Sequence, residues 1–129
     1  MEFIPGNEIK VFSNSGVESQ QLLFPENSSS SRVTITKVTV APGAVSPRHH
    51  HEASEQIWVA LLGTGTLLLG GGESRPIQAG DVVRFADGDI HGIENTGTPP
   101  FVYLSVTAPP INFRQAYAQS WSKGSSSAA

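Results

Sequence analysis

The sequence contains no cysteine, few charged residues and no long hydrophobic run. Without cysteine, no disulfide can hold the fold, and the redox compartment cannot be read from the composition. The eight basic residues are spread thinly and the formal net charge is -3, so we expect no nucleic-acid partner. The longest apolar run, Ile57 to Leu62, is far shorter than the roughly 20 residues that span a bilayer. Residues 1–10 lack the pattern of a secretory signal, so we expect a soluble, cytoplasmic protein without a membrane partner.

Turn-forming residues, in contrast, are abundant. Thirteen glycines and nine prolines among 129 residues lie between short apolar runs, as turn-rich β structure requires. These runs predict strands at residues 33–40, 56–62, 64–69, 76–85 (two short strands around Gly80 and Asp81), 90–95 and 101–107. Turns about every eight to twelve residues, with almost no helix, predict a single all-β domain, either an antiparallel sandwich or a barrel.

The chain divides into three parts. We expect residues 1–31 to be irregular or to form edge strands, residues 32–110 to form the barrel, and residues 111–129 to be a C-terminal extension. Within this extension, Asn112 to Trp121 favours a short helix, and Ser122 to Ala129 favours a disordered tail.

One predicted strand, residues 56–62, is apolar on both faces. A strand with one solvated face would alternate polar and apolar residues, but here Trp58 and Ala60 alternate with Ile57 and Val59. We expect the second face to be covered either by the N-terminal segment or by another subunit.

The four histidines are unevenly placed. Three are consecutive at positions 49–51. The fourth, His91, lies forty positions after His51. On an extended backbone His49 and His51 point to one side, and we expect His50 to point to the other, toward solvent. A neighbouring strand can bring His91 to the first pair, which would offer three imidazoles to a first-row divalent metal.

Two glycine-anchored patterns carry these histidines. The first consists of Gly43, five residues, His49, one residue, His51, four residues, Gln56, six residues and Gly63. The second consists of Gly80, five residues, Ala86, Asp87, Gly88, two residues, His91, three residues and Asn95. Sixteen residues separate the two patterns. Together they closely resemble the two signature motifs of the cupin superfamily, with a spacing similar to that of small microbial cupins.

The resemblance covers about residues 34–107 and implies a double-stranded β-helix, the cupin jelly-roll barrel, in which two antiparallel sheets surround a pocket. It implies one divalent transition metal (iron, nickel, zinc, manganese or copper) held by His49, His51, Gln56 and His91. It also implies a homodimer, because cupins commonly dimerise. Most cupins have glutamate at the position of Gln56, but some use three histidines and a glutamine, whose carbonyl oxygen can coordinate without adding charge.

Glu55 is the alternative to Gln56 as the third ligand of the first motif. Three residues separate Glu55 from His51, a spacing that cupins also permit, but seven rather than six residues separate it from Gly63. Gln56 fits both flanking spacings, so we expect Glu55 to point away from the metal.

Other side chains are candidates for the pocket. Trp58 and Phe85 are able to line it, although aromatic residues in a small barrel more often belong to the core. Arg48 and Arg84 are able to meet a substrate carboxylate, although arginines on exposed strands or loops are commoner.

Two functions fit these features. The first, which we favour, is a small metalloenzyme that acts on a small oxygen-rich substrate as a dioxygenase, isomerase or lyase; the fold does not choose among these reactions, and the catalytic residues are not identified. The second is a non-catalytic cupin that binds a sugar or organic acid. A proton-transfer group beside the metal would support the enzyme, whereas a site lined only by apolar and hydroxyl groups would support binding.

Overall fold

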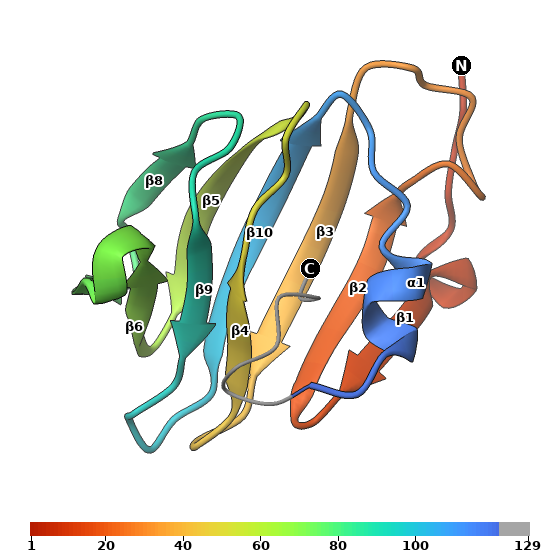
Figure 1. Cartoon of the computed structure of the whole chain (residues 1–129). Coiled ribbons are helices and arrows are strands. Elements are labelled where there is room, and N and C mark those ends of the chain that lie inside the picture. Colours follow the sequence, from red (N-terminus) through yellow and green to blue (C-terminus); the bar gives the residue numbers. More distant parts are fainter. Residues whose placement is uncertain (122–129) are drawn as a thin grey trace.

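The strands form two antiparallel sheets that face each other (Figure 1). This computed structural model describes residues 1–121; residues 122–129, where we expected a disordered tail, lie outside the described residues. The larger sheet has six strands, in the order β1 (Lys10–Asn14), β2 (Val17–Leu23), β3 (Thr34–Val40), β10 (Phe101–Ala108), β5 (Glu55–Leu62) and β8 (Val82–Phe85). The smaller sheet has four, in the order β4 (Val45–His49), β9 (His91–Glu94), β6 (Thr64–Leu69) and β7 (Ser74–Gln78).

The all-β jelly-roll fold predicted from the sequence is therefore confirmed. The described helices are one short α-helix, α1 (Arg114–Ala118), and the 3₁₀ turns Gly6–Glu8 and Gly70–Gly72. None of the helices in residues 1–121 has the length and hydropathy of a membrane-spanning segment.

The first two strands form a hairpin that widens the larger sheet. Ser15 and Gly16, the two residues of its turn, have φ values of 48° and 84°, the left-handed region that a tight hairpin of the primed type uses. β1 is the edge strand, and β2 pairs with β3. The N-terminal segment therefore extends the sheet sideways, and it does not cover the second face of β5.

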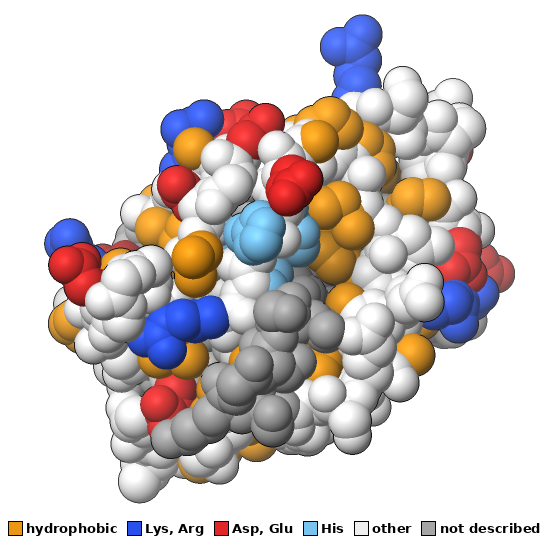
Figure 2. All heavy atoms as spheres, in the orientation of Figure 1, with side chains coloured by type: hydrophobic (Ala, Val, Ile, Leu, Met, Phe, Trp, Pro, Cys, Tyr) orange, Lys and Arg blue, Asp and Glu red, His pale blue; other side chains and the backbone are white. Residues whose placement is uncertain are grey.

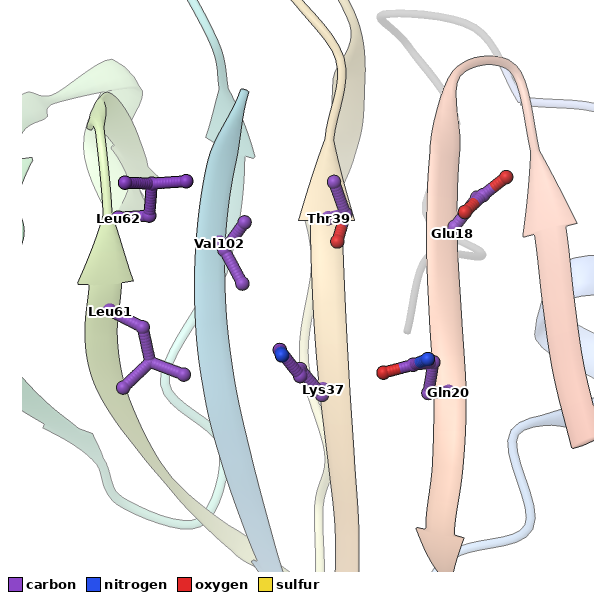
Figure 3. A pocket seen from close by; sticks show the side chains of 7 residues that line it. All are labelled: Glu18, Gln20, Lys37, Thr39, Leu61, Leu62 and Val102. Atoms are coloured by element: carbon purple, nitrogen blue, oxygen red, sulfur yellow. The ribbon is translucent and has the colours of Figure 1, made fainter. Parts of the chain in front are cut away.

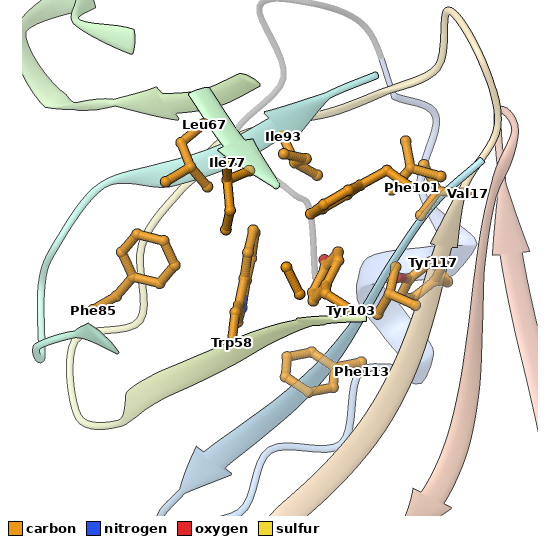
Figure 4. Close-up of a cluster of buried hydrophobic side chains, with 13 residues drawn as sticks. Val17, Trp58, Leu67, Ile77, Phe85, Ile93, Phe101, Tyr103, Phe113 and Tyr117 are labelled. Carbon is orange, nitrogen blue, oxygen red and sulfur yellow. The ribbon is translucent and has the colours of Figure 1, made fainter. Parts of the chain in front are cut away.

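The hydrophobic core lies between the two sheets (Figure 4). Strand β5 contributes Trp58 and Ala60 from its inner face, while Leu61 and Leu62 at its end are exposed. Aromatic residues from the larger sheet meet aliphatic residues from the smaller one; the buried cluster includes Val17, Val38, Val40, Trp58, Ala60, Leu67, Ile77, Phe85, Ile93, Phe101 and Tyr103.

Strand β4 lies within the predicted barrel, but the sequence did not predict it. It contains Pro47, which has no backbone N–H to donate to a sheet, and its remaining residues are mostly polar. The register of β4 against β9 shifts between Ser46 and His49, so the proline lies in an irregular part of the pairing. Pairing with β9 makes this segment a strand in spite of its low β propensity.

The backbones of β4 and β9 approach closely at Gly92. A Cβ atom at this position would lie 2.7 Å from the carbonyl oxygen of Ser46 and 2.9 Å from the carbonyl carbon of Pro47. Next to this contact His91 of β9 lies opposite His49 of β4. Only glycine permits this approach, and the approach sets the distance between the two histidines.

We therefore predict that Gly92→Ala lowers the free energy of unfolding by about 1–3 kcal/mol, because the added methyl group forces the two backbones apart. Gly6→Ala is the control, since a Cβ at Gly6 meets nothing within 4 Å, and its effect should stay within about 0.5 kcal/mol. Urea unfolding of both variants beside the wild type measures this. Equal stabilities of the two variants would contradict the steric argument.

Candidate metal centre

Three histidines from the smaller sheet and the loop after β4 converge on one point. His49 ends β4, His51 lies two residues beyond it, and His91 begins β9. One ring nitrogen from each lies within 4.8 Å of the others. The ring centroids of His49 and His91 are 4.3 Å apart, and that of His51 is 4.9 Å from His49 and 5.4 Å from His91. The three side chains are positioned to bind a metal.

Hydrogen bonds to the backbone select the tautomer that a metal needs. Nδ1 of His49 lies 2.9 Å from the carbonyl oxygen of Pro47, and Nδ1 of His91 lies 2.9 Å from that of Asp89. A carbonyl oxygen only accepts, so each Nδ1 carries the proton and donates it, which leaves a lone pair on Nε2 of the neutral ring. Nε2 of His51 is buried and has no hydrogen-bond partner within the described part of the chain. This donor set fits a first-row divalent ion.

The side chain of Gln56 extends from the larger sheet into the same place. Its Oε1 atom lies 3.1 Å from Nε2 of His91 and accepts a hydrogen bond of 3.0 Å from Nε1 of Trp58. Its Nε2 atom donates to Oγ1 of Thr107 at 3.0 Å. Glu55, the sequence alternative to Gln56, lies apart from the histidines and accepts a hydrogen bond of 2.6 Å from Nε of Arg84.

The environment keeps two of the imidazoles uncharged at neutral pH. Burial, with a smaller contribution from the nearby His91, lowers the pKa of His51 to about 4. Burial also lowers the pKa of His91 to about 4, although the hydrogen bond to the carbonyl of Asp89 opposes this shift. Neutral imidazole is the form that binds a metal ion.

Aromatic rings surround the histidines. Trp58 and Phe85, which we considered for the pocket, are buried in the core and also contact His91. Phe85 stacks on its ring at 4.3 Å and 12°, and Trp58 meets it edge-on at 5.7 Å. Phe113, in the segment after β10, meets the ring of His51 edge-on at 5.8 Å. Nothing in the sequence indicated Phe113, because its position depends on how the C-terminal segment folds back.

The remaining charged candidates serve other contacts. Arg48 donates to the backbone carbonyls of Leu69 and Glu73, at 2.8 and 3.2 Å. Arg84 forms the ion pair with Glu55 on the outside of the sheet. The side chain of His50 is 47% exposed and lies 3.6 Å from a carboxylate oxygen of Glu52.

The histidine cluster reaches the surface at one face of the molecule. Figure 2 shows the histidine side chains gathered in one patch, with hydrophobic side chains on either side. Within residues 1–121, the group of ligand atoms that converges here includes no aspartate or glutamate oxygen. The site therefore offers neutral donors, and hydrophobic and acidic side chains border the histidines at the surface (Figure 2).

The chain is similar to known proteins over most of its barrel. Residues 36–107, more than half of the chain, match the family described as "Cupin domain". The oxalate-binding protein of Thermotoga maritima is 34% identical over 90 residues, 70% of this chain and 74% of that protein. Auxin-binding protein 1 of Arabidopsis thaliana is 34% identical over 88 residues, 61% of this chain but only 44% of that protein, so this chain spans less than half of that relative. The crystal structure of a predicted oxalate decarboxylase from Thermotoga maritima has a TM-score of 0.71 and 29% identity, covering 83% of this chain and 98% of that chain.

The lowered pKa values predict that the metal-free protein loses stability in acid. Imidazoles with an ordinary pKa of 6.5 titrate near pH 4 in the folded chain, so between these values the unfolded chain binds more protons. We therefore expect the free energy of unfolding, measured with urea and a chelator, to fall as the pH drops from 6.5 toward 4. Carboxylates also titrate between pH 6.5 and 4 and contribute to the same loss of stability. The contribution of the histidines is therefore found by comparing the pH profile of the wild type with those of histidine variants. The double variant His51→Asn, His91→Asn should lose part of this dependence, and His50→Asn should keep it; identical pH profiles for all three proteins would contradict the assignment.

Proposed function

Because this chain belongs to the cupin family, we propose that it binds one divalent transition metal through His49, His51, His91 and Gln56, and that the ion binds a small oxygen-rich anion. The anion class we propose is the short dicarboxylates, with oxalate as the representative. The observation that carries this proposal is the set of converging neutral donors without a carboxylate.

The charge of the site supports an anionic ligand. Three imidazoles and one amide oxygen contribute no negative charge, so a divalent ion held by them would keep both of its positive charges. The buried surroundings of the ring nitrogens strengthen the attraction between such an ion and an anion. When bound, the ion supplies this positive charge and open coordination positions for oxygen. The protein supplies the rigid donors and the apolar walls.

Within residues 1–121, the ligand atoms that converge at the site include no carboxylate oxygen, which supports binding over catalysis by an acid or base of the protein. Glu55 is engaged by Arg84 on the outer side of the sheet, and Oδ2 of Asp89 accepts a hydrogen bond from the backbone N–H of Ala86. Phe85 and Phe113, which contact the histidine rings, carry no polar group. A binding cupin therefore agrees better with these side chains than the enzyme that the sequence favoured. The similarity to the oxalate-binding protein supports the same choice and suggests the dicarboxylate class.

We also propose that two copies of the chain pair through the outer face of the larger sheet. Part of this face is apolar, because several cross-strand neighbours on it are aliphatic: Val106 beside Ile35 and Ile57, Leu104 beside Val59, and Val59 beside Val82. Leu61, Leu62 and Val82 are 47%, 54% and 65% exposed in the single chain. Within residues 1–121 the N-terminal hairpin leaves this face uncovered, so we infer that a second copy of the chain covers the outer face of β5.

The charges around this face suit a second copy of the chain. Leu61, Leu62 and Val102 line one side of a depression of about 300 Å³, and polar residues from β2 and β3, including Lys37 and Glu18, line the other (Figure 3). Neither Lys37 nor Glu18 has an ion-pair partner within residues 1–121. In a two-fold dimer each copy presents the same surface, so Lys37 of one copy can approach Glu18 of the other. The cytoplasmic location expected from the sequence stays a prediction.

Metal and oxalate binding should depend on each other. We expect the wild-type protein, purified without a histidine tag, to hold a transition metal near stoichiometrically and to bind oxalate only when loaded, as measured by elemental analysis and calorimetry. His91→Ala should weaken metal binding at least about 100-fold and abolish oxalate binding, because one of four ligands is lost. His50→Ala is the matched control and should retain both. Oxalate binding by the metal-free protein would contradict the proposal, and consumption of oxalate by the loaded protein would favour the enzyme instead.

The dimer should dissociate when charge is placed on the outer face. We expect the double variant Leu61→Asp, Val82→Asp to sediment as a monomer at concentrations where the wild type is a dimer, because association would bury four unpaired carboxylates. Ile90→Asp alters a comparably exposed apolar residue in the turn before β9, and should leave the dimer intact. A wild-type protein that stays monomeric at about 0.1 mM would contradict the proposed interface.

A further inference from the structure

We propose that Trp58 is a positioning residue for the metal centre, in which its indole N–H holds the amide of Gln56 with the oxygen toward the histidines. This inference rests on the proposed metal site, since it concerns how one of the four proposed ligands is oriented. It assigns a role at the metal site to Trp58, a side chain that its burial alone would identify only as part of the hydrophobic core.

The indole decides which atom of the amide faces the histidines. Nε1 of Trp58 is a donor and cannot accept, so the amide atom 3.0 Å away from it must be the oxygen. The same oxygen lies 3.1 Å from Nε2 of His91. A carbonyl oxygen has two lone pairs, so one can accept the indole N–H while the other remains for a metal ion. If the amide turned over, its NH₂ group, which cannot ligate a metal, would face the histidines.

Both ends of the amide are fixed, each by a different strand. Trp58 lies two residues after Gln56 and so projects from the same face of β5, and Thr107 is the cross-strand neighbour of Gln56 on β10. The hydroxyl of Thr107 accepts the hydrogen bond from the amide nitrogen at 3.0 Å. All three residues are buried, so water does not compete for these hydrogen bonds. Loss of either partner leaves a buried amide atom unpaired and frees the side chain to rotate.

Packing holds the indole itself in place. Its ring stacks on Tyr103 at 4.1 Å and 24°, and meets Phe85 edge-on at 5.0 Å. Phe85 in turn stacks on His91, so the aromatic cluster of the core supports both the ligand-orienting indole and one imidazole. The N–H group is therefore aimed at Gln56 by contacts that do not depend on a metal.

The test distinguishes an effect of Trp58 on the orientation of the Gln56 amide from an effect on core packing. A glutamate at position 56 has two equivalent oxygens, so either one can face the metal and no orienting hydrogen bond is needed. We expect Trp58→Phe to weaken Co²⁺ binding about 10-fold or more in the wild-type background, as loss of a group that orients a ligand does elsewhere. In the Gln56→Glu background the same substitution should change Co²⁺ affinity by less than about 2-fold. Titration followed by the visible absorption of Co²⁺ gives both the affinity and the coordination geometry.

The outcomes are distinct. Equal losses in the two backgrounds would mean that Trp58 acts through packing alone, and no loss in the wild-type background would also overturn the inference. Failure of the wild-type protein to bind Co²⁺ would instead overturn the proposed metal site. If Trp58→Phe does not fold, Thr107→Val removes the other anchor at nearly constant volume; it should weaken Co²⁺ binding, and an unchanged affinity would count against the inference.

Discussion

The close pairing of β4 with β9 is the constraint on which the candidate metal centre depends. Glycine at position 92 lets the two backbones approach, and the register then places His49 opposite His91. The irregularity in β4 around Pro47 lies between the ordinary pairing at Ser46 and the histidine pair. The two imidazoles are therefore held by strand geometry, and only the third comes from a loop.

The barrel tolerates a buried polar centre because His91 is neutral and most of the buried polar atoms there are hydrogen-bonded. His49, His91 and Gln56 are almost completely buried, which would be costly for charged or unpaired groups. Burial keeps His91 neutral, its Nδ1 donates to a backbone carbonyl, and both ends of the Gln56 amide have partners. The aromatic residues of the core fill the remaining space. The same packing that stabilises the sandwich therefore fixes the donor atoms.

Much of the fold followed from the sequence, because the strands of the barrel are short apolar runs bounded by glycine and proline. The two motifs also indicated that His49, His51 and His91 would meet, and their ring nitrogens do converge. Strand β4 was missed because its polar, proline-containing sequence forms a strand only through pairing with β9. Phe113 was missed because its contact with His51 depends on the path of the chain after β10, which no local pattern encodes.

The proposed ligands do not all belong to one sheet. His49 and His91 lie on strands of the smaller sheet, and Gln56 lies on β5 of the larger one. An ion held by all of them would cross-link the two halves of the sandwich through its core. In a chain without cysteine, such a bridge would take the place of a disulfide, so metal supply and resistance to unfolding would rise and fall together.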